Sequence, residues 1–203
     1  MTQKPSKKRA ILRVAAEHFS RYGYDATHLE AIAKECGISK PAIYYHFKDK
    51  AALYETILFG RFSTLSRLIE ESTQSEDPVE NLKHYIRTFG TFLTDMPCFS
   101  AIFAREIADG ARAMPESCIV ELSGTLQRLA IILQQGREKK VFECENPFMI
   151  QMMIVTTLSS YITTEELRKR VSHALEGPHE TIDPNIEDMM ENLTQKITKA
   201  LLC

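Results

Sequence analysis

The chain has 203 residues, of which 44% are hydrophobic and 26% charged, a composition typical of an ordinary globular protein. It is long enough for one large or two small domains, which excludes a small fold that depends on disulfides or a metal. Trp is absent and strand-like alternation is scarce, whereas apolar residues with helical period fill most of the length. We therefore expect an all-α protein.

Charge is divided unevenly along the chain. Residues 1–50 carry ten basic and five acidic side chains, although the whole chain has a net charge of −2. A basic N-terminal quarter on an acidic body is expected when one domain alone meets a polyanion. A solvated basic tail at positions 4, 7, 8 and 9 would fit the same distribution.

Neither a targeting segment nor a membrane span is expected. Residues 11–19 are interrupted by Arg13, Glu17 and His18, unlike a signal peptide. The most apolar run, residues 148–162, is shorter than the roughly 20 residues that a span needs. The cysteines at 36, 98, 118, 144 and 203 form no C-x-x-C pair, which favours free thiols in a reducing, cytoplasmic compartment. A thiol-responsive switch is the alternative.

A first helix is predicted over residues 7–21, and two short helices separated by a tight turn follow it. Thr27 and Glu30 have the spacing of a capping box that opens the first of these two. Gly37 permits a left-handed turn, Ser39 is a natural N-cap, and Pro41 suits the first turn of a helix ending near residue 47. Two capped helices joined by such a turn indicate a helix-turn-helix.

The second helix of this motif presents polar and aromatic side chains outward. Ile43 and Phe47 lie four residues apart and are expected to anchor it inward. The outward residues are Lys40, Tyr44, Tyr45 and His46. Such donors and flat rings suit the major groove of DNA, and Lys50 at the start of the next helix is placed to bind a phosphate. A surface helix with half-buried aromatics is the other interpretation.

A linked pattern extends over residues 8–58. It consists of Phe19, Gly23, Tyr24, Thr27, Ile32-Ala33, Cys36-Gly37-Ile38-Ser39, Ile43-Tyr44-Tyr45-His46-Phe47, Lys48, Lys50 and Leu53. This pattern resembles the N-terminal domain of the TetR family of bacterial transcriptional regulators. The resemblance implies that the residues facing DNA include Thr27, Lys40, Tyr44, His46 and Lys50. Many members carry a hydroxyl residue where this chain has Ala42, so one frequent contact is absent and the operator sequence stays open.

A long helix is predicted from residue 50 to about residue 71, followed by a linker at 72–78. Helices are then predicted over residues 78–95, 98–108, 115–135, 147–173 and 185–202. The expected organisation is a three-helix helix-turn-helix domain, residues 1–50, joined by the long helix to a larger helical domain. The resemblance implies that this larger domain, residues 51–203, binds a ligand and forms the dimer.

The last predicted helix carries apolar residues close to the spacing of a coiled-coil seam, which fits either its own core or a subunit interface. The resemblance implies that the last two long helices pair with those of a second subunit in a four-helix bundle. The interface residues expected on this basis are Ile154, Leu158, Met189, Leu193 and Ile197.

Aromatic and methionine side chains in the larger domain suit an adaptable apolar pocket, although residues at helical spacing also build cores. The expected pocket residues are Phe62, Tyr85, Phe89, Phe92, Phe103, Met152 and Tyr161. The resemblance implies that an unknown small, largely apolar ligand held there shifts the long helix and swings the DNA-binding domains. The sequence does not identify that ligand.

Motifs of catalysis and of metal binding, among them G-x-S-x-G, the P-loop and H-E-x-x-H, are missing. We therefore expect no enzyme activity, no catalytic residue, no cofactor and no metal. The expected function is that of a homodimeric repressor bound to a near-palindromic site in double-stranded DNA, without a membrane partner. The alternatives are a ligand-independent or thiol-responsive regulator, and a helical adaptor that binds other proteins.

Overall fold

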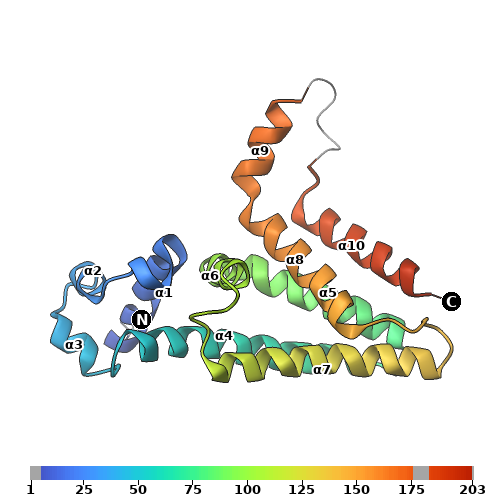
Figure 1. Cartoon of the computed structure of the whole chain (residues 1–203), viewed down its shortest axis with the longest axis horizontal. Helices are drawn as coiled ribbons and strands as arrows, with labels where there is room; N and C mark the ends of the chain where they lie inside the picture. Colours follow the sequence, from blue (N-terminus) through green and yellow to red (C-terminus); the bar gives the residue numbers. More distant parts are fainter. Residues whose placement is uncertain (1–5, 176–182, 203) are drawn as a thin grey trace, which may run out of the picture. The chain divides into compact units, whose positions relative to one another are not determined.

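The computed structural model describes residues 6–175 and 183–202, and the described part is helical with no strand (Figure 1). The helices are α1 Lys7–Ala26, α2 Leu29–Glu35, α3 Lys40–Tyr44, α4 Lys50–Ser72, α5 Pro78–Asp95, α6 Pro97–Ala108, α7 Glu116–Glu138, α8 Pro147–Thr163, α9 Glu165–His173 and α10 Ile186–Leu201. The prediction of an all-α protein is confirmed.

The chain forms two compact units. Unit 1 comprises Met1–Ser63 and Pro97–Glu121, and unit 2 comprises Thr64–Met96 and Leu122–Cys203. The long helices α4 and α7 each contribute one part to each unit. This division differs from a boundary at residue 50, because α6 belongs to the same unit as α1–α3. The functional division into residues 1–50 and 51–203 stays a prediction.

Unit 1 is built around α1, which packs along α6 and α2. Its buried face consists of Ile11, Val14, Ala15 and Phe19. The Phe19 ring meets the Tyr54 ring edge-on with their centroids 4.8 Å apart, which joins α1 to the first turns of α4. Further along α4, Phe62 packs against Phe99 and Phe103 of α6 at 5.0 and 5.3 Å. Aromatic contacts therefore join three helices of unit 1.

A buried carboxylate also ties α6 to α4. The Tyr54 hydroxyl donates to Glu106 Oε1 at 2.5 Å, and both residues are buried. Burial, followed by this hydrogen bond to Glu106, raises the pKa of Tyr54, so that the phenol stays protonated. The other oxygen of Glu106 has no partner within the part of the chain that the structure describes. Breaking this pair would leave a buried carboxylate with neither oxygen satisfied.

Unit 2 is built around α5, which packs against α8 and α10 (Figure 1). Asp77 caps the N-terminus of α5 by accepting from the Val79 amide at 2.8 Å. The apolar face that α5 buries includes Leu82, Tyr85, Ile86, Phe89 and Leu93. Gly90 lets α10 approach closely, because a Cβ there would lie 2.3 Å from Met190 Sδ. These contacts make a tightly packed three-helix core.

The segment predicted as one helix over residues 147–173 is instead two helices, α8 and α9, with a break at Thr164. Hydroxyl side chains cluster before the break and compete for backbone carbonyls. Thr163 Oγ1 donates to the Ser159 carbonyl, and Thr164 Oγ1 donates to the Ser160 carbonyl. Such bonds back to residue i−4 weaken and bend helices. Beyond the break, the Arg168 guanidinium stacks 3.5 Å from the centroid of the Tyr161 ring.

Within residues 6–175 and 183–202, none of the helices combines the length and the apolar character that crossing a bilayer requires.

The two glycines of α7, Gly124 and Gly136, differ in the space available for an added methyl group, which leads to a prediction about stability. A Cβ at buried Gly136 would lie 2.0–2.7 Å from ring atoms of Phe142, whereas one at Gly124 would meet only Ser66 Oγ at 3.5 Å. We expect Gly136→Ala to lower the free energy of unfolding by about 1–3 kcal/mol through overpacking. Gly124→Ala should raise it by about 0.5–1 kcal/mol through helix propensity. Urea titrations would measure both, and equal effects of the two substitutions would contradict the packing described at Phe142.

Candidate nucleic-acid interface

The helix-turn-helix is present as predicted. Leu29, Ile32 and Ala33 of α2 are buried, and Gly37 after it adopts a left-handed φ of +65°. The Ile38 amide then donates to the Ala33 carbonyl at 3.0 Å, which closes the turn. Ser39 precedes α3 in an extended conformation, with Pro41 in the first helical turn. The Ser39 side chain makes no capping hydrogen bond, so its backbone geometry alone starts the helix.

The recognition helix α3 and the turn after it are anchored by two apolar side chains. Ile43 is fully buried and Phe47 is 5% exposed, four residues apart as the sequence predicts. Between them Tyr44 is 46% exposed and Tyr45 is 85% exposed, with Lys40 and His46 partly exposed. The structure therefore brings Lys40, Tyr44, Tyr45 and His46 together on one exposed surface, which we call the α3 face.

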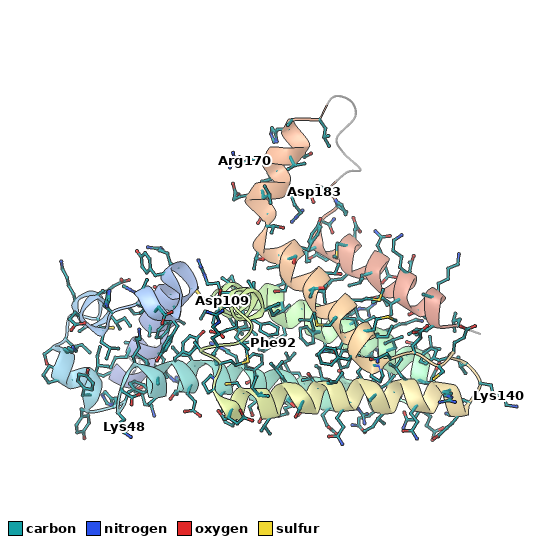
Figure 2. The ribbon with its side chains drawn as sticks, in the orientation of Figure 1. Lys48, Phe92, Asp109, Lys140, Arg170 and Asp183 are labelled. Atoms are coloured by element: carbon teal, nitrogen blue, oxygen red, sulfur yellow. The ribbon has the colours of Figure 1, made fainter. Side chains whose placement is uncertain are left out.

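The cations beside the α3 face differ in their surroundings. The Lys40 ammonium pairs with the Glu30 carboxylate, and its hydrogen bond raises the pKa of Lys40 and lowers that of Glu30. The same ammonium lies 5.8 Å from the centroid of the Tyr44 ring. Lys48 is exposed and makes no hydrogen bond or ion pair within the described part of the chain (Figure 2). Lys48 is therefore an unpaired cation among the described residues, whereas the Lys40 ammonium is partly neutralised by Glu30.

Thr27 does not have the role that the sequence predicted. It is 1% exposed, and its hydroxyl donates to the Gly23 carbonyl at 2.6 Å. The residue that caps α2 is His28, without a side-chain hydrogen bond, so the capping box with Glu30 does not form. The predictions of a capping box and of a Thr27 side chain facing DNA are wrong, because the hydroxyl is already used at the end of α1.

The Lys50 ammonium, predicted to bind a phosphate, already makes hydrogen bonds within the protein. Its ammonium donates to the carbonyls of Tyr24, Asp25 and Thr27 at 2.8, 3.2 and 3.2 Å. It also lies 4.4 Å from the centroid of the Tyr24 ring, within range of a cation–π contact. An ammonium has three donors, so these carbonyls occupy all of them. Lys48, two residues earlier, is the exposed cation that sequence reasoning left out of the site.

The predicted ligand-pocket residues do not form one cluster within either unit. Phe62 and Phe103 lie in unit 1, where they pack on each other. Five lie in unit 2, namely Tyr85, Phe89, Phe92, Met152 and Tyr161. The first three are core residues, Met152 is 42% exposed, and the Tyr161 hydroxyl contacts Asp183. The sequence could not separate core aromatics from pocket aromatics, because both recur with helical period.

A polar pair in the core of unit 2 was missed. The Tyr85 hydroxyl lies 2.6 Å from Gln151 Oε1 and 3.2 Å from the Thr125 carbonyl, all in buried surroundings. Burial raises the pKa of Tyr85 further above its ordinary value, and the protonated hydroxyl acts as a hydrogen-bond donor. Ser159, two turns further along α8, is also buried, and its hydroxyl has no partner among the described residues. The signal in the sequence was Gln151, a polar residue in the most apolar run of the chain.

Three of the five predicted dimer-interface residues are buried within the chain itself. Ile154, Leu158 and Ile197 are at most 1% exposed, so their selection as contacts with a second copy is wrong. They pack in the core that α5, α8 and α10 share. Met189 and Leu193 are partly exposed. The apolar periodicity of these helices therefore arises at least partly from burial inside unit 2, and it does not identify residues that contact a second copy.

Comparison with known proteins decides the family. The model of bacterial regulatory proteins of the tetR family matches residues 11–57. The model of the C-terminal region of YcdC-like proteins matches residues 61–202, well over half of the chain. The chain belongs to the TetR family. Its members are transcriptional regulators that bind DNA through the helix-turn-helix, so the predicted family and broad function are confirmed.

Relatives of this TetR-family chain include the transcriptional regulator RutR of Escherichia coli K12. It is 33% identical over 124 residues, which cover 61% of this chain and 57% of RutR. The negative regulator IcaR of Staphylococcus aureus, strain Newman, is 40% identical over 62 residues, covering 30% of this chain and 33% of IcaR. The matched parts thus span less than two thirds of either relative.

Solved structures show the same fold over nearly the whole chain. PfmR of Thermus thermophilus has a TM-score of 0.72 and 22% identity, covering 93% of this chain and 97% of PfmR. FadR of Bacillus subtilis, in complex with stearoyl-CoA, has a TM-score of 0.72 and 18% identity, covering 95% and 98%. Among the described residues of the TetR-family chain, no group of three or more metal-ligating side chains gathers at one place.

Proposed function

We propose that this protein is a dimeric repressor that binds a near-palindromic DNA operator through the α3 face and leaves it when a small effector binds unit 2. The observation that carries the DNA-binding part is the exposure of Tyr44 and Tyr45 beside two buried anchors on a short helix that begins with Pro41 in its first turn. Side chains of this kind supply hydroxyl donors, flat rings and cations to base edges, thymine methyl groups and phosphates.

Two copies are needed for a strong complex. A single α3 covers a few base pairs, and its phosphate contacts alone give weak, salt-sensitive binding. Two copies related by a two-fold axis must present their recognition helices about 34 Å apart to enter successive major grooves. Pairing then raises the effective concentration of the second helix. A footprint over the DNA upstream of the protein's own gene tests this arrangement, and two protected half-sites about one helical turn apart are expected.

We expect Tyr45→Ala to weaken operator binding by on the order of 1–3 kcal/mol, because a good base contact is worth that much. Its stability should be unchanged, since the side chain is 85% exposed. Tyr22→Ala is the matched control, because Tyr22 is 50% exposed on α1, outside the motif. Fluorescence anisotropy with operator and scrambled DNA measures both variants. Unchanged discrimination by Tyr45→Ala would remove this tyrosine from the α3 face as a base-reading residue.

The surface proposed for pairing lies on α8, on α9 and on the turn that follows α9 in unit 2. Its exposed apolar side chains, which we call the α8–α9 face, are Phe148, Met149, Met152, Met153, Leu167, Val171 and Leu175. Seven such side chains from each of two copies would bury roughly 1,000 Å² in total, about the minimum for a specific interface. Met189 and Leu193 are partly exposed on α10, the helix that packs against α8 in the same unit.

The pairing proposal predicts that Met149→Glu combined with Met153→Glu yields monomers. Both side chains are more than 40% exposed, so the fold should survive while two carboxylates oppose burial in the interface. Asn192→Glu combined with Gln195→Glu, at exposed positions of α10, adds the same charge and should leave the dimer intact. Sedimentation velocity measures the mass of each variant. A dimeric methionine variant would place the interface elsewhere.

We propose that the effector reaches the Tyr85–Gln151 pair in unit 2, and that the core, which is packed around this pair in the structure, opens to admit it. Buried polar atoms within an apolar core suit a ligand with a long apolar part and a polar group. The unpaired Ser159 hydroxyl on the same helix offers a further contact. A structural relative was solved with stearoyl-CoA, which makes long-chain acyl-CoA the first class of compound to try. A ligand can release DNA only by binding one of the two conformations more tightly.

Stearoyl-CoA added to the protein–operator complex at increasing concentration should release the DNA, as measured by anisotropy. Gln151→Leu should keep operator affinity and require on the order of tenfold more ligand, because one buried hydrogen bond to the ligand is lost. Release that is equal for both proteins would place the ligand elsewhere. No release by any acyl-CoA would favour the ligand-independent regulator, and the absence of salt-dependent DNA binding would favour the protein-binding adaptor.

A further inference from the structure

The carboxyl end of α1 is held by two cations that come from other helices. Gly23 breaks the helical path with φ +76° and ψ 178°, and the chain continues to Ala26. The last turn of α1 contains no basic residue of its own. Carbonyls at a helix end lack intrahelical partners and carry a partial negative charge. In unit 1, side chains from α4 and α6 donate hydrogen bonds to these carbonyls.

Lys50, at the start of α4, holds the part that follows Gly23. Its ammonium reaches the carbonyls of Tyr24, Asp25 and Thr27, between 2.8 and 3.2 Å away. The Tyr24 ring covers the same ammonium at 4.4 Å. Asp49, the residue before Lys50, caps α4, because its carboxylate accepts from the Ala52 amide at 2.7 Å.

Arg105, on α6, holds the part that precedes Gly23. Its guanidinium donates to the Ser20 carbonyl at 3.4 Å and to the Arg21 carbonyl at 3.1 Å. Between the two cations, the buried Thr27 hydroxyl donates to the Gly23 carbonyl. The bend from which α2 and α3 continue is therefore fixed from both sides.

We infer that Lys50 is a positioning residue of the DNA-binding unit and not a phosphate ligand. Together with Arg105 it forms a clasp that sets the direction in which the chain leaves α1, and hence the orientation of α2 and α3. The phosphate contact at this corner falls to Lys48, which is exposed and unpaired in the described residues. This assignment rests on the proposed DNA-binding function for its functional consequence, whereas the clasp itself is a property of the free protein.

Salt dependence separates the two roles of a lysine. A lysine that neutralises a phosphate releases a counterion, so its removal lowers the slope of log Kd against log salt by about one. A positioning lysine leaves this slope unchanged and instead loosens the segment that it holds. Lys50→Met and Lys48→Met therefore form a matched pair, two residues apart and identical in the chemistry removed.

For Lys50→Met we expect an unchanged slope, operator Kd raised on the order of tenfold, and amide hydrogen exchange of residues 24–35 accelerated to a similar degree. For Lys48→Met we expect the slope to fall by about one with exchange unchanged. Arg105→Met should accelerate exchange around residues 20–27 without changing the slope. A slope lowered by Lys50→Met with exchange unaltered would overturn the assignment.

Lys50→Gln keeps two donors and guards against a variant that fails to fold. Its exchange rate is expected to lie between those of the wild-type protein and Lys50→Met. Wild-type exchange together with a lowered slope would again assign Lys50 to a phosphate. If the wild-type protein binds no DNA at low salt, the proposed function fails, while the exchange measurements still decide whether the clasp exists.

Discussion

The burial of Ile43 and Phe47 is the constraint on which the α3 face depends. These two side chains lie four residues apart and are almost completely withdrawn from solvent. A helix as short as α3 has little stability of its own, so packing must hold it. With both anchors buried, Tyr44 and Tyr45 lie on the opposite side of the helix and are exposed, while His46 is partly exposed. The order of apolar and aromatic residues thus determines both the packing and the exposed surface.

Much of this organisation could be predicted from local signals. Gly37 requires a left-handed turn, Pro41 fits only a first turn, and the anchors of α3 recur at helical spacing. These features depend on neighbouring residues, so the sequence contains what is needed to infer them. Thr27 shows where such inference ends. Its spacing to Glu30 is that of a capping box, yet the hydroxyl turns to Gly23, because the bend at the end of α1 brings that carbonyl within reach.

Non-local contacts account for the other differences. The sequence cannot show that Lys50 reaches carbonyls more than twenty residues away, or that Arg105 reaches α1 across more than eighty. Nor can periodicity tell whether Ile154 and Leu158 face their own core or a second copy, since either role requires an apolar side chain. Grouping of α6 with the DNA-binding helices likewise emerges only when α1 and α6 are seen to pack together.

The pairing of Lys40 with Glu30 has a consequence for how the protein searches a chromosome. Glu30 partly neutralises this cation in the free protein, and because the pair is solvent-exposed and weak, a random stretch of duplex gains only slightly less from Lys40 than from an unpaired lysine. Separation of the Lys40–Glu30 pair is favourable only where the DNA places a stronger hydrogen-bond acceptor next to Lys40. Because a genome presents vast numbers of irrelevant sites, a self-neutralised lysine shortens the time spent on each of them and favours rapid transfer to the true target.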